Sequence, residues 1–253
     1  MYNETEAREL VIKAGHKLIE NKLIARTWGN ISARISDTEF VITPSGRAYE
    51  TLRPEELVKV SADTLEYDGK IKPSSEKGIH AAAYKLRPDC DFVIHTHQFY
   101  ASAVCAEGKD TGFAPCAKYG LSGTKKLAAN VADVIQANPE KKMFLMSNHG
   151  ALVTGNSFEE AFALAGELEE NCKKLFDDNR HEPYRGSWLD DYAQMFDSRG
   201  KPGDTEDASA VEMVRQKNEA AASYVTTARP IPGLVALLEH TVYRKKYSKL
   251  KGK

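Results

Sequence analysis

Phe92-Val93-Ile94-His95-Thr96-His97 is the most informative stretch of this chain. Its apolar first half predicts a buried strand, and that strand ends in two histidines one residue apart. Because successive side chains of a strand alternate between faces, His95 and His97 point the same way, with their Cβ atoms roughly 7 Å apart. Two imidazoles at that separation can bind one ion. The spacing therefore predicts a metal site at the end of a buried strand.

A third histidine follows another short apolar run. Met143-Phe144-Leu145-Met146 is predicted as a buried strand, and Asn148-His149-Gly150 comes directly after it. Three protein nitrogens leave one coordination position for water or substrate, which is typical of catalytic rather than structural zinc. An isolated His-x-His pair is more often two polar residues on a half-exposed strand. The interpretation therefore depends on what else the chain carries.

Three upstream segments rich in small residues, 27–32, 42–46 and 72–76, are predicted as turns. Such turns expose backbone N–H groups and hydroxyls that can hold an anion, although each one alone is also ordinary turn chemistry. Ser74 and Ser75 precede a helical apolar pattern that begins at Ile79. A phosphate bound there would meet the positive end of a helix.

Five motifs, in this order, carry a resemblance to the class II aldolase/adducin family over roughly residues 6–178. They are G-N-x-S at Gly29–Ser32, T-P-S-G at Thr43–Gly46, P-S-S-E at Pro73–Glu76, H-T-H at His95–His97 and N-H-G at Asn148–Gly150. The resemblance implies that His95, His97 and His149 are metal ligands and that Glu76 is the catalytic carboxylate beside the metal. It also implies a phosphate cradle, which consists of Asn30, Ser45, Gly46, Ser74 and Ser75. The implied ion is Zn²⁺, with Mn²⁺ or Co²⁺ as alternatives.

The resemblance further implies a fold of the α/β class with three layers, in which helices flank a central, mostly antiparallel sheet. Residues 1–180 are then the metal-dependent catalytic domain. Residues 181–253 are longer than the family's tail, and we interpret them as a helical C-terminal extension that serves as a lid or a subunit clasp. Relatives assemble as tetramers with active sites between neighbours, so a homotetramer is expected.

These residue types predict the chemistry. A dication held by three neutral imidazoles keeps most of its charge, so it can polarise the oxygens of a ketose phosphate and stabilise the enediolate left when a C–C bond breaks. Glu76 could then carry the proton. We expect a metal-dependent aldolase that cleaves a small phosphorylated sugar into dihydroxyacetone phosphate and an aldehyde.

Several alternatives stay open. A 4-epimerase uses the same retro-aldol chemistry, although that branch of the family carries Asp where this chain has Glu76. Decarboxylases and a dehydratase of the superfamily share the metal ligands. The adducin head is a structural module that lacks the metal set, and the intact histidines argue against it. The connection between His97 and Pro115 looks shorter than in the aldolases and epimerases, so the residues that recognise the aldehyde are not identified.

Composition excludes some classes of function. The chain has 253 residues and a formal net charge of −1, which gives no reason to expect nucleic acid as a partner. No stretch approaches the ~20 apolar residues of a membrane span, and the N-terminus lacks an apolar leader segment, so we expect no membrane partner and a cytoplasmic location. The four cysteines form no C-x-x-C pair, which favours reduced thiols.

Periodicity predicts the remaining elements. Helical patterns cover residues 6–21, 77–86, 123–136 and 157–178, and the last begins with a Ser-x-x-Glu capping box at Ser157. Strand patterns cover residues 39–43, 57–61, 92–97 and 143–146. Strands and helices are thus mixed, which fits the implied fold better than a strictly alternating pattern.

Overall fold

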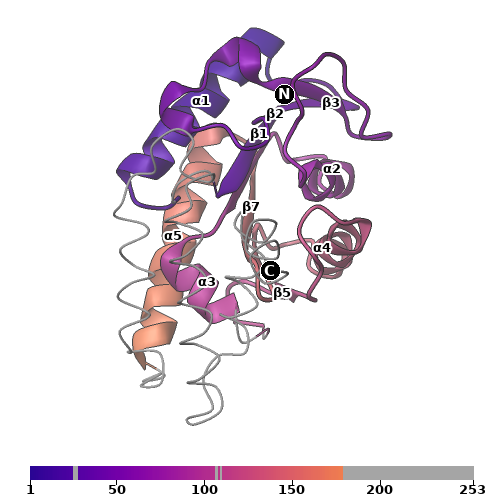
Figure 1. The fold of residues 1–253 in the computed structure, drawn as a ribbon. Helices are drawn as coiled ribbons and strands as arrows, with labels where there is room; N and C mark the ends of the chain where they lie inside the picture. The colour runs from indigo at the N-terminus through magenta and orange to yellow at the C-terminus, as the bar shows by residue number, and fades with distance from the viewer. Residues whose placement is uncertain (25–27, 106–107, 109, 179–253) are drawn as a thin grey trace, which may run out of the picture.

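The computed structural model describes residues 1–24, 28–105, 108 and 110–178 (Figure 1). The predicted extension over residues 181–253 lies outside this part of the chain. The helices are α1 (Glu4–Glu20), α2 (Lys77–Leu86), α3 (Phe99–Cys105), α4 (Lys125–Ala137) and α5 (Phe158–Asp178). The strands are β1 (Gly29–Arg34), β2 (Glu39–Ile42), β3 (Val58–Ser61), β4 (Phe92–Thr96), β5 (Cys116–Ala117), β6 (Met143–Met146) and β7 (Gly150–Gly155). Two short 3-10 helices cover Tyr49–Thr51 and Pro54–Glu56.

The strands form one sheet in the order β3-β2-β1-β4-β7-β6-β5. Every pairing is antiparallel except that of β5 with β6. The central strand β4 pairs with β1 on one side and with β7 on the other, and all five of its residues are buried. The expected α/β class with a mostly antiparallel sheet between helices is confirmed.

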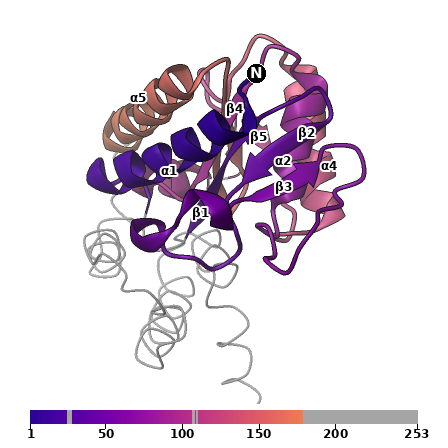
Figure 2. The same ribbon diagram turned by 90° about the horizontal axis from the view of Figure 1, so that it is seen from above.

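Figures 1 and 2 show the sheet between two layers of helices. Helices α1, α3 and α5 cover one face, where they form a core with Ile31 and Ile94. Helices α2 and α4 cover the other face and pack against Val93 and Leu152. Because side chains alternate along β4, His95 faces the layer of α2 and α4. None of the described helices is long and apolar enough to cross a membrane.

Most predicted elements lie within two residues of the observed ones, and α2 and β6 have the predicted bounds. The prediction was wrong for residues 27–32, because Gly29–Arg34 is strand β1 and not a turn. Its polar side chains Asn30, Ser32 and Arg34 alternate with apolar ones but are buried under α2, so the strand has no exposed face. Helix α3 and strands β5 and β7 were not predicted.

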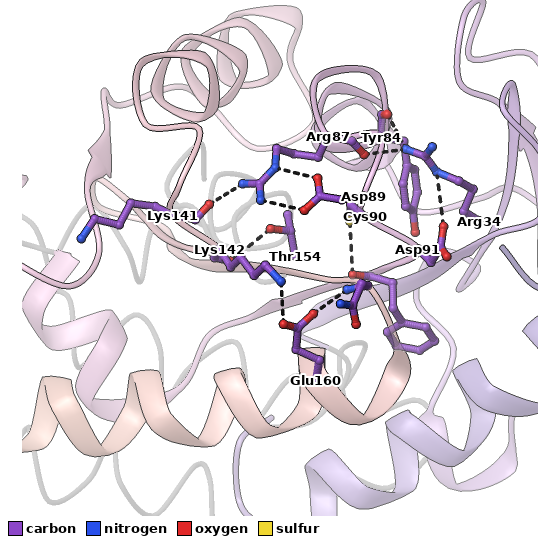
Figure 3. Close-up of polar contacts among 12 residues, drawn as sticks. Arg34, Tyr84, Arg87, Asp89, Cys90, Asp91, Lys141, Lys142, Thr154 and Glu160 are labelled. Atoms are coloured by element: carbon purple, nitrogen blue, oxygen red, sulfur yellow. Dashed lines mark hydrogen bonds and ion pairs between the residues drawn. The ribbon is translucent and has the colours of Figure 1, made fainter.

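Two buried arginines anchor the C-terminal end of α2 (Figure 3). Arg34, at the end of β1, donates from Nη2 to the carbonyl oxygens of Tyr84 and Arg87. These are carbonyls of a helix end, where intrahelical partners are missing. Arg87 in turn donates to the carbonyl oxygen of Lys141. Since Glu76 directly precedes the other end of α2, this anchoring helps to set where that carboxylate lies.

Candidate metal centre

Four buried side chains converge at one end of the sheet: Glu76, His95, His97 and His149. Their ligand atoms all lie within 4.8 Å of one another. His95 is on β4 and His97 follows that strand, whereas His149 lies in the turn between β6 and β7 and Glu76 precedes α2. The structure therefore brings together the three histidines predicted as metal ligands and the carboxylate predicted beside them.

The imidazole nitrogens face one another across short distances. His95 Nε2 lies 3.1 Å from His97 Nε2 and 3.3 Å from His149 Nε2. Glu76 places Oε1 2.8 Å from His149 Nε2 and Oε2 3.1 Å from His95 Nε2. Two ligands of a tetrahedral zinc ion with Zn–N bonds of about 2.0–2.1 Å are separated by about 3.3–3.4 Å. The spacing of the nitrogens therefore fits a divalent ion.

The tautomer of His95 supports the same interpretation. His95 Nδ1 lies 2.7 Å from the carbonyl oxygen of Ala151 on β7, so Nδ1 carries the hydrogen and donates it. Nε2 is then left with a lone pair that faces two other imidazole nitrogens. Such a buried arrangement is favourable when a cation lies between the nitrogens, and a backbone carbonyl is a common second partner of metal-binding histidines. These residues could hold a metal ion.

Two glycines let the neighbouring strands approach β4 at the histidines. A Cβ atom on Gly150 would lie 2.5 Å from the carbonyl oxygen of Thr96, 3.2 Å from the His97 ring and 3.3 Å from the His95 ring. A Cβ atom on Gly29, whose φ is +107°, would lie 2.5 Å from the carbonyl oxygen of His95. Strands β1 and β7 therefore both begin on a residue without a side chain.

The segment that follows β4 is fixed by α5. Thr96 Oγ1 donates to Gln98 Oε1 at 2.5 Å, and Gln98 Nε2 donates to the carbonyl oxygen of Ala165 at 2.8 Å. Because His97 lies between Thr96 and Gln98, these two bonds hold its backbone between the sheet and α5. The histidine is thus placed by a rigid junction rather than by an open loop.

Glu76 also accepts hydrogen bonds from two neutral side chains. Asn30 Nδ2 donates to Oε2 at 2.9 Å, and Ser122 Oγ donates to Oε1 at 2.8 Å. Burial raises the pKa of Glu76, but positive charge on the imidazoles of His149 and His95 outweighs burial and holds that pKa well below its usual range. The carboxyl group is therefore ionised at neutral pH and can accept a proton.

Two other buried histidines on this face are neutral. Burial, with the nearby imidazoles of His95 and His149, lowers the pKa of His97 well below its usual range. A neutral imidazole is the form that binds a metal. Burial also lowers the pKa of His80 to about 3, and His80 contacts Asn30 and not the ligand nitrogens.

Two of the predicted phosphate-binding turns lie side by side. The Ser45 N–H donates to the carbonyl oxygen of Lys72, and the Ser74 N–H donates to that of Thr43, each at 3.0 Å. Pro44 and Pro73 form a bridge between the same two segments. The two turns are therefore fixed against each other, directly before the first turn of α2.

The five predicted phosphate-binding residues differ in their surroundings. Three of them are exposed: Ser45, Gly46 and Ser75. Ser74 is buried, and its Oγ accepts from the backbone N–H of Glu76 at 3.2 Å. Asn30 is buried as well, on β1, and its amide contacts Glu76 and His80. The exposed three thus offer a surface for an anion, whereas Asn30 belongs to the surroundings of the carboxylate.

Ser122 is a site residue that the sequence analysis missed. It lies in the turn before α4, where Thr124 caps the helix by accepting from the Leu127 N–H at 3.3 Å. A Cβ atom on Gly123 would lie 3.1 Å from Ser75 Cβ, so this turn packs against the predicted cradle. The signal was present, because Ser-Gly-Thr before a helical pattern is a small-residue turn like those predicted at residues 42–46 and 72–76.

Known proteins resemble this chain over most of the part that the structure describes. Residues 9–176 match the family model of the Class II Aldolase and Adducin N-terminal domain. The 3-oxo-tetronate 4-phosphate decarboxylase of Escherichia coli O6:H1 is 31% identical over 189 residues, which are 68% of this chain and 87% of that protein. The 5-deoxy-D-ribulose 1-phosphate aldolase of Bacillus thuringiensis serovar kurstaki is 33% identical over 181 residues, with 67% and 83% covered. A solved L-fuculose 1-phosphate aldolase is 27% identical and superposes with a TM-score of 0.62 over 76% of this chain and 95% of that one.

Proposed function

Because the chain belongs to the family of the class II aldolase and adducin N-terminal domain, we propose that it is a divalent-metal-dependent aldolase that cleaves a small ketose phosphate into dihydroxyacetone phosphate and an aldehyde. The observation that carries this proposal is the convergence of Glu76 with three buried imidazoles within 4.8 Å. Burying such groups together is costly unless they bind a cation, so a purely structural module would gain nothing from them. Zinc is the proposed ion, with Mn²⁺ or Co²⁺ as alternatives.

Each residue of the site has a distinct proposed role. His95, His97 and His149 would hold the ion, which when bound supplies the positive charge that polarises the substrate's carbonyl and hydroxyl oxygens. Glu76 would take the proton and return it at its carboxylate, and it is 7% exposed, so bulk water has little access to it. Ser122 would keep Oε1 of that carboxylate in place through its hydroxyl.

We propose that the substrate's phosphate binds where the two paired turns meet the start of α2. Ser45, Gly46 and Ser75 would supply exposed donors there, with Ser74 beneath them. The first turn of a helix favours an anion through its unpaired N–H groups and its dipole. Asn30 was predicted with this group, but its contact with the carboxylate leads us to propose a role beside Glu76.

A decarboxylase of a phosphorylated 3-oxo acid is the second candidate. The relative from Escherichia coli that is 31% identical is named as such an enzyme. Loss of carbon dioxide from a 3-oxo acid and retro-aldol cleavage of a ketose both leave an electron pair on the carbon next to a carbonyl. A site that stabilises this charge can therefore serve either reaction.

Turnover of the metal-loaded protein against a panel of substrates separates these candidates. The panel contains ketose 1-phosphates, ketose 5-phosphates and a 3-oxo acid phosphate. An aldehyde together with dihydroxyacetone phosphate identifies the aldolase, carbon dioxide identifies the decarboxylase, and a stereoisomer of unchanged mass identifies the epimerase. No product from any member of the panel would overturn the proposed function.

Glu76→Gln tests the proposed proton carrier, because it keeps the size of the side chain but cannot hold a proton at neutral pH. The variant should keep its metal and lose on the order of 10²–10⁴-fold in kcat. Exchange of the C–H hydrogens of dihydroxyacetone phosphate with solvent deuterium, followed by NMR, isolates the proton step. Glu140→Gln, at an exposed position, is the matched control. Exchange at the wild-type rate in Glu76→Gln would remove Glu76 from the mechanism.

We further propose a homotetramer, as the family resemblance implies, and a cytoplasmic location. Size-exclusion chromatography with light scattering measures the first, and a monomer of 28.0 kDa in solution would contradict it. The role of residues 181–253 as a lid or a subunit clasp also stays a proposal, since these residues lie outside the described part of the chain.

A further inference from the structure

A line of buried hydrogen bonds runs from Glu76 into the layer between the sheet and α2. Asn30 Oδ1 lies 2.5 Å from His80 Nε2, and His80 Nδ1 lies 2.6 Å from Ser32 Oγ. Ser32 Oγ lies 2.7 Å from the Tyr84 hydroxyl. At the other end, Asn30 Nδ2 donates to Glu76 at 2.9 Å. All five side chains are buried. We call this line, from Glu76 to Tyr84, the buried relay.

The Asn30 amide assigns a direction to each hydrogen bond in the buried relay. Its nitrogen Nδ2 donates to Glu76. The amide oxygen then faces His80, which must donate from Nε2. A neutral imidazole has a single N–H, so His80 Nδ1 must accept a hydrogen bond from Ser32. Ser32 can in turn accept from Tyr84.

His80 is the member that holds the oxygen end of the Asn30 amide. Its ring stacks on Phe40, with centroids 6.5 Å apart and an interplanar angle of 13°, so the ring plane is held. Without a donor at Nε2, the buried amide oxygen of Asn30 would lose its partner in the relay, and only the bond to Glu76 would hold the amide. Because a buried carbonyl oxygen without a partner is unfavourable, the amide would shift and weaken its bond to the carboxylate.

We propose that His80 is a positioning residue for the reaction: its Nε2–H fixes the Asn30 amide and, through it, the Glu76 carboxylate beside the candidate metal ligands. This inference rests on the proposed role of Glu76. His80 touches neither the ligand nitrogens nor, in this arrangement, the carboxylate itself, so it acts through Asn30.

Three variants separate positioning from packing. His80→Gln keeps one donor and one acceptor at the places of the two ring nitrogens but cannot become charged. His80→Leu removes both polar atoms. Tyr84→Phe is the matched control, because it deletes a buried hydroxyl from the far end of the relay and leaves Ser32 able to donate to His80.

NMR of the metal-free protein observes the relay without any substrate. The expected result is His80 as the Nε2–H tautomer, together with an Asn30 side-chain amide that exchanges slowly with solvent. The Asn30 amide signal should persist in His80→Gln and in Tyr84→Phe and be lost in His80→Leu. A His80 ring with its hydrogen on Nδ1, or an Asn30 amide that is unchanged in His80→Leu, would overturn the proposal.

Kinetics of the metal-loaded protein provide the second measurement. The kcat of His80→Leu should fall on the order of 10–100-fold, which is the effect of weakening one hydrogen bond to a charged group, here the bond from Asn30 to Glu76. KM and metal content should stay close to wild type. His80→Gln should restore kcat. Equal kcat in His80→Leu and Tyr84→Phe would refute the positioning role and leave the proposed function standing. If the wild type turns over no substrate, the proposed function fails, and the NMR result alone decides whether His80 orients Asn30.

Discussion

Glu169 should make the stability of this protein fall as pH rises toward neutrality. Its carboxylate, on α5, accepts from the backbone N–H groups of Tyr100 and Ala101 at the start of α3, at 2.8 and 3.0 Å. Burial raises the pKa of Glu169 to about 7, although these N–H groups and Gln98 favour the ionised form. The folded protein therefore keeps a proton on Glu169 at a pH where the unfolded chain, with the ordinary pKa of 4.5, has released it.

Linkage determines the sign and the size of this effect. Because the folded state binds the proton more tightly, the stabilisation is fully present below pH 4.5 and is lost as pH rises through about 7. A gap of about 2.5 pH units corresponds to about 3 kcal/mol, at about 1.36 kcal/mol per unit. Part of the Glu169 side chain is exposed, and solvent screening reduces the effect. We therefore expect about 2 kcal/mol.

Urea denaturation of wild type and Glu169→Gln between about pH 4 and about pH 8 measures this contribution. Other titrating groups are common to both proteins, so the difference between the two stability curves isolates Glu169. Wild type should lose about 2 kcal/mol relative to the variant across this range. If the two N–H bonds outweigh burial, the pKa lies below 4.5 and wild type gains stability instead as pH rises. That opposite slope, or parallel curves, would refute the reasoning.

Four further changes test the site. His97→Ala should lose most of the bound metal while circular dichroism shows the fold intact, and full occupancy by elemental analysis would reject this ligand. Ser75→Ala should raise KM for a phosphorylated substrate more than for its unphosphorylated analogue, and equal effects on both would rule out a phosphate contact. Ser122→Ala should lower kcat on the order of tenfold by removing one hydrogen bond from the carboxylate, and Ser122→Thr should restore it; an unchanged kcat in the alanine variant would show that this bond is dispensable. Gly150→Ala should lose metal, because its Cβ would lie 2.5 Å from a backbone oxygen of β4, and a variant with full metal content would show that the strands can move apart at low cost.

The long helices were predictable because each has one apolar face at helical spacing. Helix α4, for example, buries Leu127, Val131 and Ile135, whereas the residues between them are partly or fully exposed. Strand β7 was missed for the opposite reason. All six of its residues are buried, because helices cover both faces of the sheet and β4 and β6 pair with its two edges. It also begins and ends with glycine. A short run without alternation carries no period, and the glycines of β7 leave it without the continuous apolar sequence that identified β6.

The metal ligands and the rest of the site differ in how local their signal is. His95 on β4 and His97 directly after it are two residues apart, so strand geometry alone predicts that they meet. Their meeting with His149 depends on the pairing of β4 with β7, which periodicity does not provide. Ser122 reaches Glu76 from 46 residues away in the sequence, through the packing of the turn before α4. Such contacts follow from tertiary packing rather than from any local pattern.

The layer between α2 and β1 nevertheless has a signature in the sequence: polar residues recur every four positions on the helix side and every two positions on the strand. The polar residues that face each other there are Glu76, His80 and Tyr84 on the helix side and Asn30, Ser32 and Arg34 on the strand. Steps of four residues along a helix advance by about 6 Å, and steps of two residues along a strand advance by about 6.6 Å, so the two sets stay in step. A hydrogen bond joins them at each step: Asn30 to Glu76, Ser32 to His80, and Arg34 to the carbonyl oxygen of Tyr84. A strand can therefore bury polar side chains where a helix more than forty residues later supplies a partner for each, and neither segment alone reveals this.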